Sequence, residues 1–267
     1  MLSNFLRLFF CLTVFTSAAP LQADILCQLK PATLQSFNEY AANVESQLER
    51  RWSGHAPFLE VDGNRSERDG VMHGDFAIRS VTGDDPLSVP EGLIHDWVGT
   101  VYIPKARPSE IISVLQDFNR HKRIYPDVID SRLLSRNGDT LEGYWRLEQK
   151  HVLTVDFDVY QKVRYEQVAP DKWVCRAYTR QISEVEHAGE RDEHRFPDGE
   201  GHGYLWRLYA YWSIESEGNG ALAECRTISL SRDVPAMLGF VIKPFLHQMP
   251  RDSLAATLRD TKAAVAR

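Results

Sequence analysis

The sequence lacks the features that mark several large classes of protein. Beyond its first residues it has no apolar run of the roughly 20 residues that a membrane-spanning helix needs. It also has no excess of positive charge, because 37 acidic residues outnumber 31 lysines and arginines. We expect no transmembrane segment in the mature chain. We expect no nucleic-acid partner either, since no basic stripe is present to neutralise phosphates.

Motifs of nucleophilic and metal chemistry are also missing. The chain contains no Gly-x-Ser-x-Gly motif, which marks one large group of serine hydrolases. A loop at 184–202 holds His187, His194 and His202 among acidic residues. Their spacing matches no compact ligand pattern, such as two histidines one helical turn apart. The pattern predicts a solvated hairpin loop, and we expect neither a metal nor a cofactor.

Cysteine is scarce, with four in 267 residues. One of them lies in the first 23 residues, which leaves Cys27, Cys175 and Cys225. An odd number allows at most one internal bridge. A third predicted strand separates the strands of Cys175 and Cys225, which would hold them about 9.6 Å apart. That spacing is beyond the reach of a disulfide, so we expect both thiols to be free.

Residues 1–23 have the pattern of a secretory signal peptide. Arg7 lies near the start, an apolar stretch covers 8–15, and small residues follow at 17–19. We expect cleavage after Ala23, leaving one domain at 24–267 that is exported to the periplasm or secreted.

Hydrophobic periodicity predicts an ordered succession of helices and strands. Apolar residues at intervals of three and four predict an amphipathic helix over 31–52. Ser109 is the expected N-cap of a helix that reaches about residue 117, and a helical turn ends before Pro126. Strands are predicted at 58–61, 71–81, 93–103, 128–136, 141–151, 154–168, 172–185, 205–216 and 221–232, and helices at 235–248 and 250–265.

The predicted strand at 154–168 alternates most clearly. Val155, Phe157, Val159, Val163 and Tyr165 share one face, and charged residues occupy most of the other. A strand with one dry face is typical of an antiparallel sheet.

Two segments carry a family resemblance. Residues 96–134 read as strand, helix, helix and strand, with the aromatic-Pro pair Tyr125-Pro126 ending the second helix, and 224–258 read as a last strand, a Val-Pro exit and a closing helix. With the order of elements, they resemble the START domain, the lipid-carrying member of the SRPBCC superfamily, which also contains pollen-allergen carriers and polyketide cyclases. The resemblance implies an α+β helix-grip fold, in which a curved antiparallel sheet wraps around a long C-terminal helix with an apolar cavity between them. It also implies an N-terminal helix and two short helices after the third strand.

If the inward faces follow the alternation, strand side chains would line this cavity opposite side chains of the last helix. The same residues equally fit a solid core. The candidates are Trp97, Trp145, Leu147, Val155, Phe157, Val159, Tyr209 and Tyr211 from the strands, and Phe240, Val241, Phe245 and Met249 from the helix.

Arg207 is a further candidate because its surroundings, Tyr-Leu-Trp-Arg-Leu-Tyr-Ala-Tyr-Trp, are otherwise almost wholly apolar. A buried guanidinium needs a carboxylate from the protein or from a ligand. The alternative is a cross-strand ion pair on the outer face of the sheet.

Three functions are compatible with this sequence. The leading hypothesis is non-catalytic binding or transport of a hydrophobic or lipid-like small molecule in an exported compartment. The second is a cyclase or aromatase-type enzyme that uses the same cavity, with His151, Tyr209 and Glu224 as the acid or base to examine first. The third is an interaction module without a cavity. The sequence leaves the ligand and the oligomeric state open.

Overall fold

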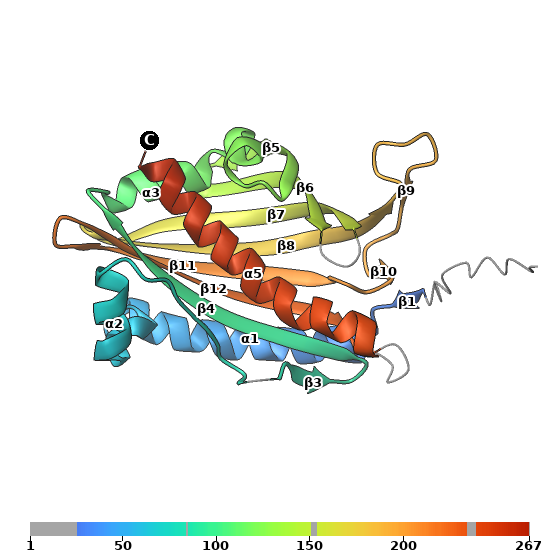
Figure 1. Ribbon diagram of the computed structural model, residues 1–267, viewed down its shortest axis with the longest axis horizontal. Helices are drawn as coiled ribbons and strands as arrows, with labels where there is room; N and C mark the ends of the chain where they lie inside the picture. Colours follow the sequence, from blue (N-terminus) through green and yellow to red (C-terminus); the bar gives the residue numbers. More distant parts are fainter. Residues whose placement is uncertain (1–25, 84, 151–153, 234–238, 267) are drawn as a thin grey trace, which may run out of the picture.

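A curved antiparallel sheet forms the centre of the molecule (Figure 1). The computed structural model describes residues 26–83, 85–150, 154–233 and 239–266, except for the side chains of 239–247. In spatial order the main strands are β2 (Ala77–Ser80), β4 (Gly92–Pro104), β12 (Gly220–Arg232), β11 (Arg207–Glu217), β8 (Lys172–Glu186), β7 (Thr154–Ala169), β6 (Thr140–Lys150) and β5 (Val128–Asn137). Short strands β3 (Leu87–Val89) and β9 (His194–Arg195) pair with β4 and β8, and β1 (Cys27–Gln28) pairs separately with β10 (Glu200–Gly201).

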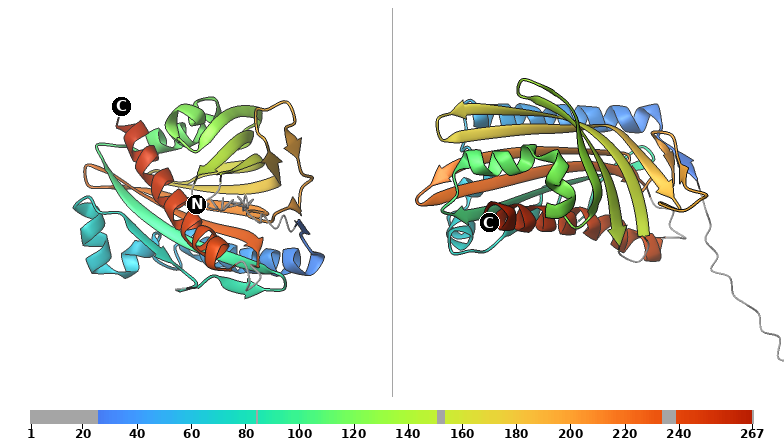
Figure 2. Two further views of the ribbon diagram at one scale, coloured as in Figure 1. Left: turned by 45° about the vertical axis from the view of Figure 1, so that its right-hand side comes forward. Right: turned by 90° about the horizontal axis from the view of Figure 1, so that it is seen from above.

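Two long helices cover opposite faces of the sheet (Figure 2). The C-terminal helix α5 (Gly239–Val265) crosses the concave face over β4 and β12. The N-terminal helix α1 (Pro31–Trp52) lies on the convex face, where Phe37 and Val44 pack with Ile228. This is the α+β helix-grip architecture predicted from the sequence.

A glycine allows α5 to approach the sheet closely. A Cβ at Gly99 in β4 would lie 2.6 Å from Leu258 Cδ1 and 3.3 Å from Leu254 Cδ2. Both leucines belong to α5, and their side chains are buried in the core between α5 and the sheet. Ordinary carbon contacts are about 3.5–4.0 Å, so a side chain here would push the helix outward.

Three short helices follow β4 and bring the chain over the far half of the sheet. They are α3 (Pro108–Gln116), the 3-10 turn η2 (Phe118–Arg120) and α4 (His121–Ile124). The ring of Phe118 rests on the backbone of Gly143 in β6, where a Cβ would overlap it. The short helices therefore form a side wall between α5 and the open edge of the sheet.

Most predicted elements are confirmed, and the largest differences lie in the first third of the chain. The helix over 31–52 is found with those bounds. The strands predicted at 58–61 and 71–81 are wrong: the chain forms the 3-10 helix η1 (Glu60–Gly63) and α2 (Arg65–Met72), and only the short β2 falls within 71–81. The apolar residues of this region cover the outer face near Val174 and Leu222, so packing rather than strand alternation sets their spacing.

Helix ends also differ from prediction. Helix α3 begins at Pro108 with Arg107 as its N-cap, so Ser109 lies inside the helix. Proline is favoured in the first turn because the first N–H groups of a helix have no intrahelical partner. The two predicted C-terminal helices are one helix from Gly239 onward, and residues 235–238 lie outside the described part of the chain.

Candidate ligand-binding cavity

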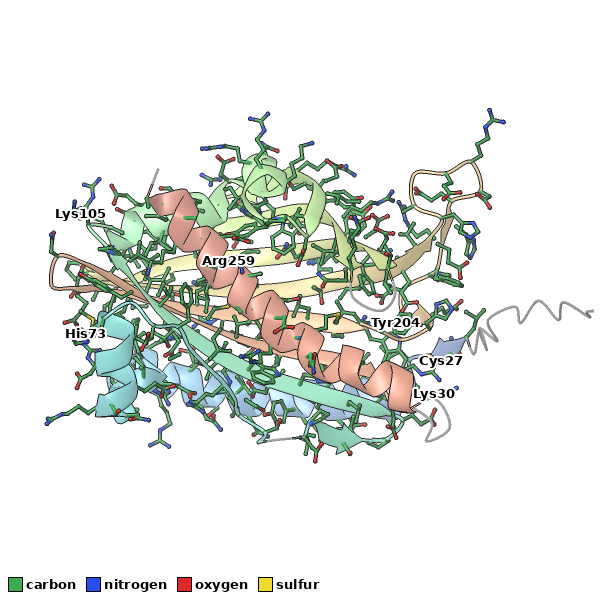
Figure 3. The ribbon with its side chains drawn as sticks, in the orientation of Figure 1. Cys27, Lys30, His73, Lys105, Tyr204 and Arg259 are labelled. Atoms are coloured by element: carbon green, nitrogen blue, oxygen red, sulfur yellow. The ribbon has the colours of Figure 1, made fainter. Side chains whose placement is uncertain are left out.

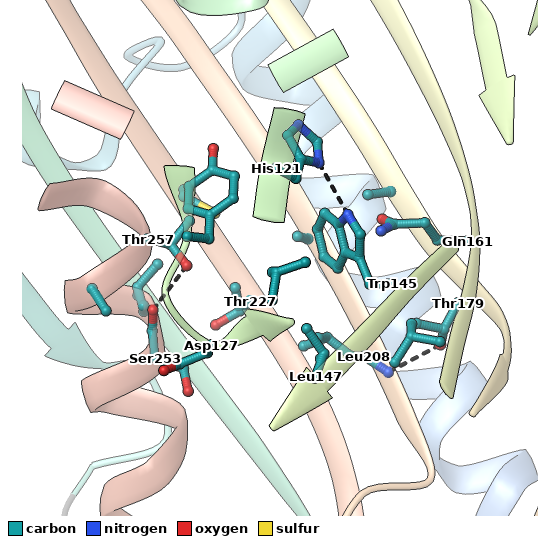
Figure 4. A pocket seen from close by; sticks show the side chains of 18 of the residues that line it. His121, Asp127, Trp145, Leu147, Gln161, Thr179, Leu208, Thr227, Ser253 and Thr257 are labelled. Carbon is teal, nitrogen blue, oxygen red and sulfur yellow. Dashed lines mark hydrogen bonds between the residues drawn. The ribbon is translucent and has the colours of Figure 1, made fainter. Parts of the chain in front are cut away.

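A cavity of about 190 Å³ lies between the concave face of the sheet, α5 and the side wall of short helices. Side chains from β6, β7, β8, β11 and β12 form its floor, and Met249, Leu254 and Thr257 of α5 lie over it. Figure 4 shows Trp145, Leu147 and Leu208 facing this space.

The floor is built from side chains of paired strands. Trp145 and Leu147 of β6 lie opposite Val159 and Phe157 of β7. These four side chains are apolar, and Phe157 and Val159 are almost completely buried. The floor is therefore mainly hydrophobic.

Across the middle of the floor, Cys175, Trp212 and Cys225 stand side by side on β8, β11 and β12. Both thiols are free, and the intervening strand is the one predicted from the sequence. Burial raises the pKa of both thiols, so they present uncharged sulfur to the cavity. Cys27 is also free and lies at the same end of the molecule as Tyr204 (Figure 3).

A β-bulge at Arg180 changes which residues of β8 face inward. Gln161 pairs with Thr179, while Tyr160 pairs with Gln181, so Arg180 is the extra residue of the ladder. Its exposed side chain forms an ion pair with Glu142 at 3.2 Å. Because a bulge shifts the pleat by one residue, Thr179 stands beside Gln161 in the cavity wall.

The side wall is aromatic and internally hydrogen-bonded. Trp145 Nε1 donates to His121 Nδ1 at 3.0 Å, and His121 Nε2 donates to the Val114 carbonyl at 3.2 Å. Burial lowers the pKa of His121 to about 4, so the imidazole is neutral at ordinary pH. Both ring nitrogens are used, which leaves this histidine without a free base for chemistry.

Two phenols brace the same wall. The Tyr125 hydroxyl lies 3.0 Å from Thr261 Oγ1 on α5, and the Tyr165 hydroxyl donates to the Leu115 carbonyl at 2.7 Å. Burial raises the pKa of both tyrosines. They therefore serve as neutral links between the sheet, the side wall and α5.

A chain of polar side chains joins α5 to the edge of the sheet at one side of the cavity. Gln149 Nε2 donates to Asp127 Oδ2 at 3.3 Å, and Ser253 Oγ of α5 donates to Gln149 Oε1 at 3.5 Å. These weak bonds span the boundary between helix and sheet. This boundary is the polar rim of an otherwise apolar site.

Gln161 carries an amide on the floor, whose other polar side chains, Thr179, Thr227 and Ser229, carry hydroxyl groups. Its side chain is 6% exposed and lines the cavity, and its Nε2 has no hydrogen-bond partner in the described part of the chain. Its directly paired neighbour Thr179 accepts from the Leu208 N–H at 3.1 Å. The amide is directed toward the side of Trp145 (Figure 4).

The structure brings part of the predicted set together. Trp145, Leu147, Phe157, Val159 and Met249 line the cavity. Val155 belongs to the same hydrophobic cluster but lies outside the cavity lining, and Trp97 packs in the core beneath α5. The side chains of Phe240, Val241 and Phe245 lie outside the described residues.

The assignment of Tyr209, Tyr211 and Arg207 to the cavity is wrong, because all three point to the convex face. Tyr211 donates to Glu45 Oε1 at 3.0 Å, and the Tyr209 ring meets that of Phe37 on α1 edge to face at 5.1 Å. Arg207 forms an ion pair with Asp198 at 2.9 Å. An ion pair on the outer face of the sheet was the alternative to a place in the cavity. Strand β11 is buried on both faces, so it lacks the alternation that would reveal its orientation.

The suggested catalytic groups do not meet at the cavity. His151 lies outside the described residues, and Tyr209 faces α1. Glu224 points to the convex face, where its carboxylate accepts from the Glu60 N–H at 2.9 Å and from Thr100 Oγ1 at 2.9 Å. Burial raises its pKa to about 7, yet the sheet separates it from the cavity.

The acidic loop is more integrated than predicted. His187 is exposed and lies 2.7 Å from Asp192, as in a solvated loop. Further along, however, Arg195 pairs with the buried Asp158, and Phe196 is itself buried. Within the described ranges no cluster of three His, Cys, Asp or Glu side chains is arranged to hold a metal. Nor is any described helix both long and apolar enough to span a bilayer.

Sequence reasoning missed Gln161 and His121. The signal for Gln161 was present: in the run Val155, Phe157, Val159, Val163, it occupies the one inward position that is polar. A buried polar residue is more informative than another apolar one. His121 had no comparable signal, because its role depends on Trp145 from a distant strand.

No family model matches the chain, and no curated protein matches its sequence. Solved structures similar to it include a STAR-related lipid transfer protein fragment from Xanthomonas axonopodis, at 16% identity and a TM-score of 0.48, covering 72% of this chain and 99% of that one. A START superfamily protein from Mycobacterium smegmatis matches at 14% identity and a TM-score of 0.42, covering 64% and 97% of the two chains. The chain has a START-like fold. An aromatase/cyclase from Streptomyces sp. R1128 also matches, at 11% identity and a TM-score of 0.42, covering 65% and 94%.

Within this START-like fold, identities of this size concern architecture alone. What the cavity binds has to be inferred from the side chains that line it.

Proposed function

We propose that this protein binds or carries a hydrophobic small molecule in the cavity beneath α5, without catalysing a reaction on it, in an exported compartment. The observation that carries the proposal is the apolar cavity of about 190 Å³. A void that holds one water needs only about 10–15 Å³, and well-packed cores contain few larger ones. A volume more than ten times that size favours a binding site over a solid interaction module.

The lining favours binding over acid–base catalysis. The imidazole of His121 and the phenols of Tyr125 and Tyr165 are engaged in internal hydrogen bonds. Apolar contact with the floor would supply most of the affinity, at about 25 cal/mol per Å² buried before ordering costs. The signal-peptide pattern at residues 1–23 supports the proposed export.

The test fills the cavity and compares the result with the same change in a solid core. Val159 in β7 lines the cavity and is 1% exposed, whereas Val174 in β8 is 0% exposed and packs under Leu59 on the convex face. Val159→Trp places its indole in open space, so Tm should stay within a few degrees of the parent. Val174→Trp overpacks a filled core, which costs about 1–3 kcal/mol or more.

Binding is measured by titrating both variants and the parent with a neutral, fluorescent, apolar probe. The dye 1-anilinonaphthalene-8-sulfonate is unsuitable because it carries a charge. We expect a neutral probe such as 2-ethylnaphthalene to bind the parent and Val174→Trp, and to lose binding in Val159→Trp. Native mass spectrometry of the purified protein should also reveal a small molecule that leaves on denaturation. A parent that binds no apolar probe, together with a Val159→Trp variant that unfolds, would contradict the proposal and favour a solid core.

A further inference from the structure

We infer that the cavity selects an uncharged, mainly apolar molecule with one oxygen acceptor, and that the side-chain amide of Gln161 donates to that oxygen. The inference rests on the proposed function and adds the chemical class of the ligand. It is drawn from the unpartnered amide of Gln161 on the floor and from the charges around the cavity.

Gln161 supplies the first step. Its side chain is 94% buried, and its Nε2 has no partner within the described ranges of the chain. A buried N–H without an acceptor is unfavourable, because it has lost its hydrogen bonds to water. A ligand oxygen in the cavity would restore one of those bonds.

The surroundings of this amide make it the orienting contact. Its neighbours on the inward face of β7 are Val159 and Val163, and Ala177 lines the adjoining part of β8. Thr179, opposite Gln161, already accepts the Leu208 N–H that the ladder leaves unpaired. A mainly apolar floor with this buried, unpartnered amide would hold a ligand oxygen at a defined place.

The charges around the cavity disfavour an anionic ligand. The described lining residues contain no lysine or arginine but include the carboxylates of Asp127 and Asp260. Asp260 Oδ2 is buried without a hydrogen-bond partner in the described part of the chain. Arg259 Nε lies 3.2 Å from Asp260 Oδ1, so the repulsion of a carboxylate ligand comes mainly from Asp127, and no described lining residue offers it a cation. A ligand ammonium group could pair with these aspartates, but it has no lone pair with which to accept from Gln161.

The test compares three probes that share one ring system: 2-acetylnaphthalene, 2-ethylnaphthalene and 2-naphthoate. The first carries a ketone oxygen, the second a hydrocarbon group of similar size, and the third an anion at pH 7. Their affinities are measured by calorimetry for the parent, Gln161→Leu and Gln181→Leu. Gln181 is the matched control, because it neighbours the same bulge but does not line the cavity. Its Nε2 donates to Ser183 Oγ at 3.1 Å.

We expect the ratio of ketone to hydrocarbon affinity to fall about tenfold in Gln161→Leu, equivalent to about 1.4 kcal/mol, and to stay unchanged in Gln181→Leu. The parent should bind 2-naphthoate at least about tenfold more weakly than the ketone. The Tm of Gln161→Leu should be unchanged or higher, because the substitution removes an unpartnered donor.

Three results would overturn the inference. An unchanged ratio in Gln161→Leu would show that the amide does not meet the ligand, and equal binding of 2-naphthoate would refute charge selection. A Tm several degrees lower for Gln161→Leu would assign the amide a structural partner. If the parent binds 2-ethylnaphthalene, any one of these results refutes the inference but leaves the proposed function standing. A parent that binds none of the three probes refutes the proposed function, and the inference with it.

Discussion

The close approach of α5 to Gly99 leads to a prediction whose sign is set by the structure. In Gly99→Ala the new Cβ would lie 2.6 Å from Leu258 Cδ1, about 1 Å inside normal carbon contact. The closer leucine, Leu258, is 0% exposed and does not line the cavity, so it has no open space to move into. Overpacking of this kind costs about 1–3 kcal/mol.

A second effect of this substitution has the opposite sign. Alanine stiffens the unfolded chain, which stabilises a strand position by about 0.5–1 kcal/mol relative to glycine. The expected net loss for Gly99→Ala is therefore up to about 2.5 kcal/mol. At about 2–4 °C per kcal/mol for a chain of this size, Tm should fall by up to about 10 °C.

Gly63 provides the matched control, because a Cβ there meets no heavy atom within 4 Å. Gly63→Ala keeps only the backbone effect, so its Tm should be unchanged or slightly higher. Both variants are compared with the parent by calorimetric and circular-dichroism melting. If Gly99→Ala is stabilised as much as Gly63→Ala, then α5 does not press on β4 as described, and the reasoning is refuted.

Two further predictions concern titratable and oxidisable groups. Burial raises the pKa of Glu224 to about 7, whereas a glutamate in the unfolded chain has a pKa of about 4.3. Between these values the folded state keeps a proton that the unfolded state has lost. The free energy of unfolding should therefore fall by up to about 3 kcal/mol as the pH rises from about 4.5 to 7. Urea unfolding at stepped pH should show a flatter profile for Glu224→Gln, and parallel profiles would contradict this assignment. Intact-mass analysis of alkylated, non-reduced protein should show no bond between Cys175 and Cys225, which lie on either side of Trp212; a linked pair would contradict the strand order.

The sequence predicted elements well where one face of an element is dry and the other wet. Helix α1 and strand β7 have such patterns, and their bounds and inward faces could be read from periodicity. Strand β11 could not be oriented in the same way. Helix α1 buries the convex face of this strand, and Leu208 and Trp212 on its concave face line the cavity. With large side chains on both faces, a shift of one residue looks equally good in the sequence.

Other parts of the site depend on contacts between distant segments. The 3-10 helix η1 forms where Glu224 of β12 binds the N–H of Glu60, a pairing of residues 164 positions apart. The bulge at Arg180 likewise becomes visible only when β7 and β8 are paired. Local propensity carries no information on such pairings, which explains why the segments at 58–61 and 71–81 are predicted as strands.

The sheet also acts as a partition between two chemical environments. On its α1 side lies a carboxyl group, Glu224, whose protonation changes near neutrality; on its α5 side, the nearest imidazole, His121, stays uncharged until the solution is strongly acidic. A protein passing between compartments of different acidity would therefore change its resistance to unfolding without changing the charge of this wall. The proposed ligand binding and the stability of the fold can therefore respond to acidity independently, although a single layer of strands separates the groups concerned.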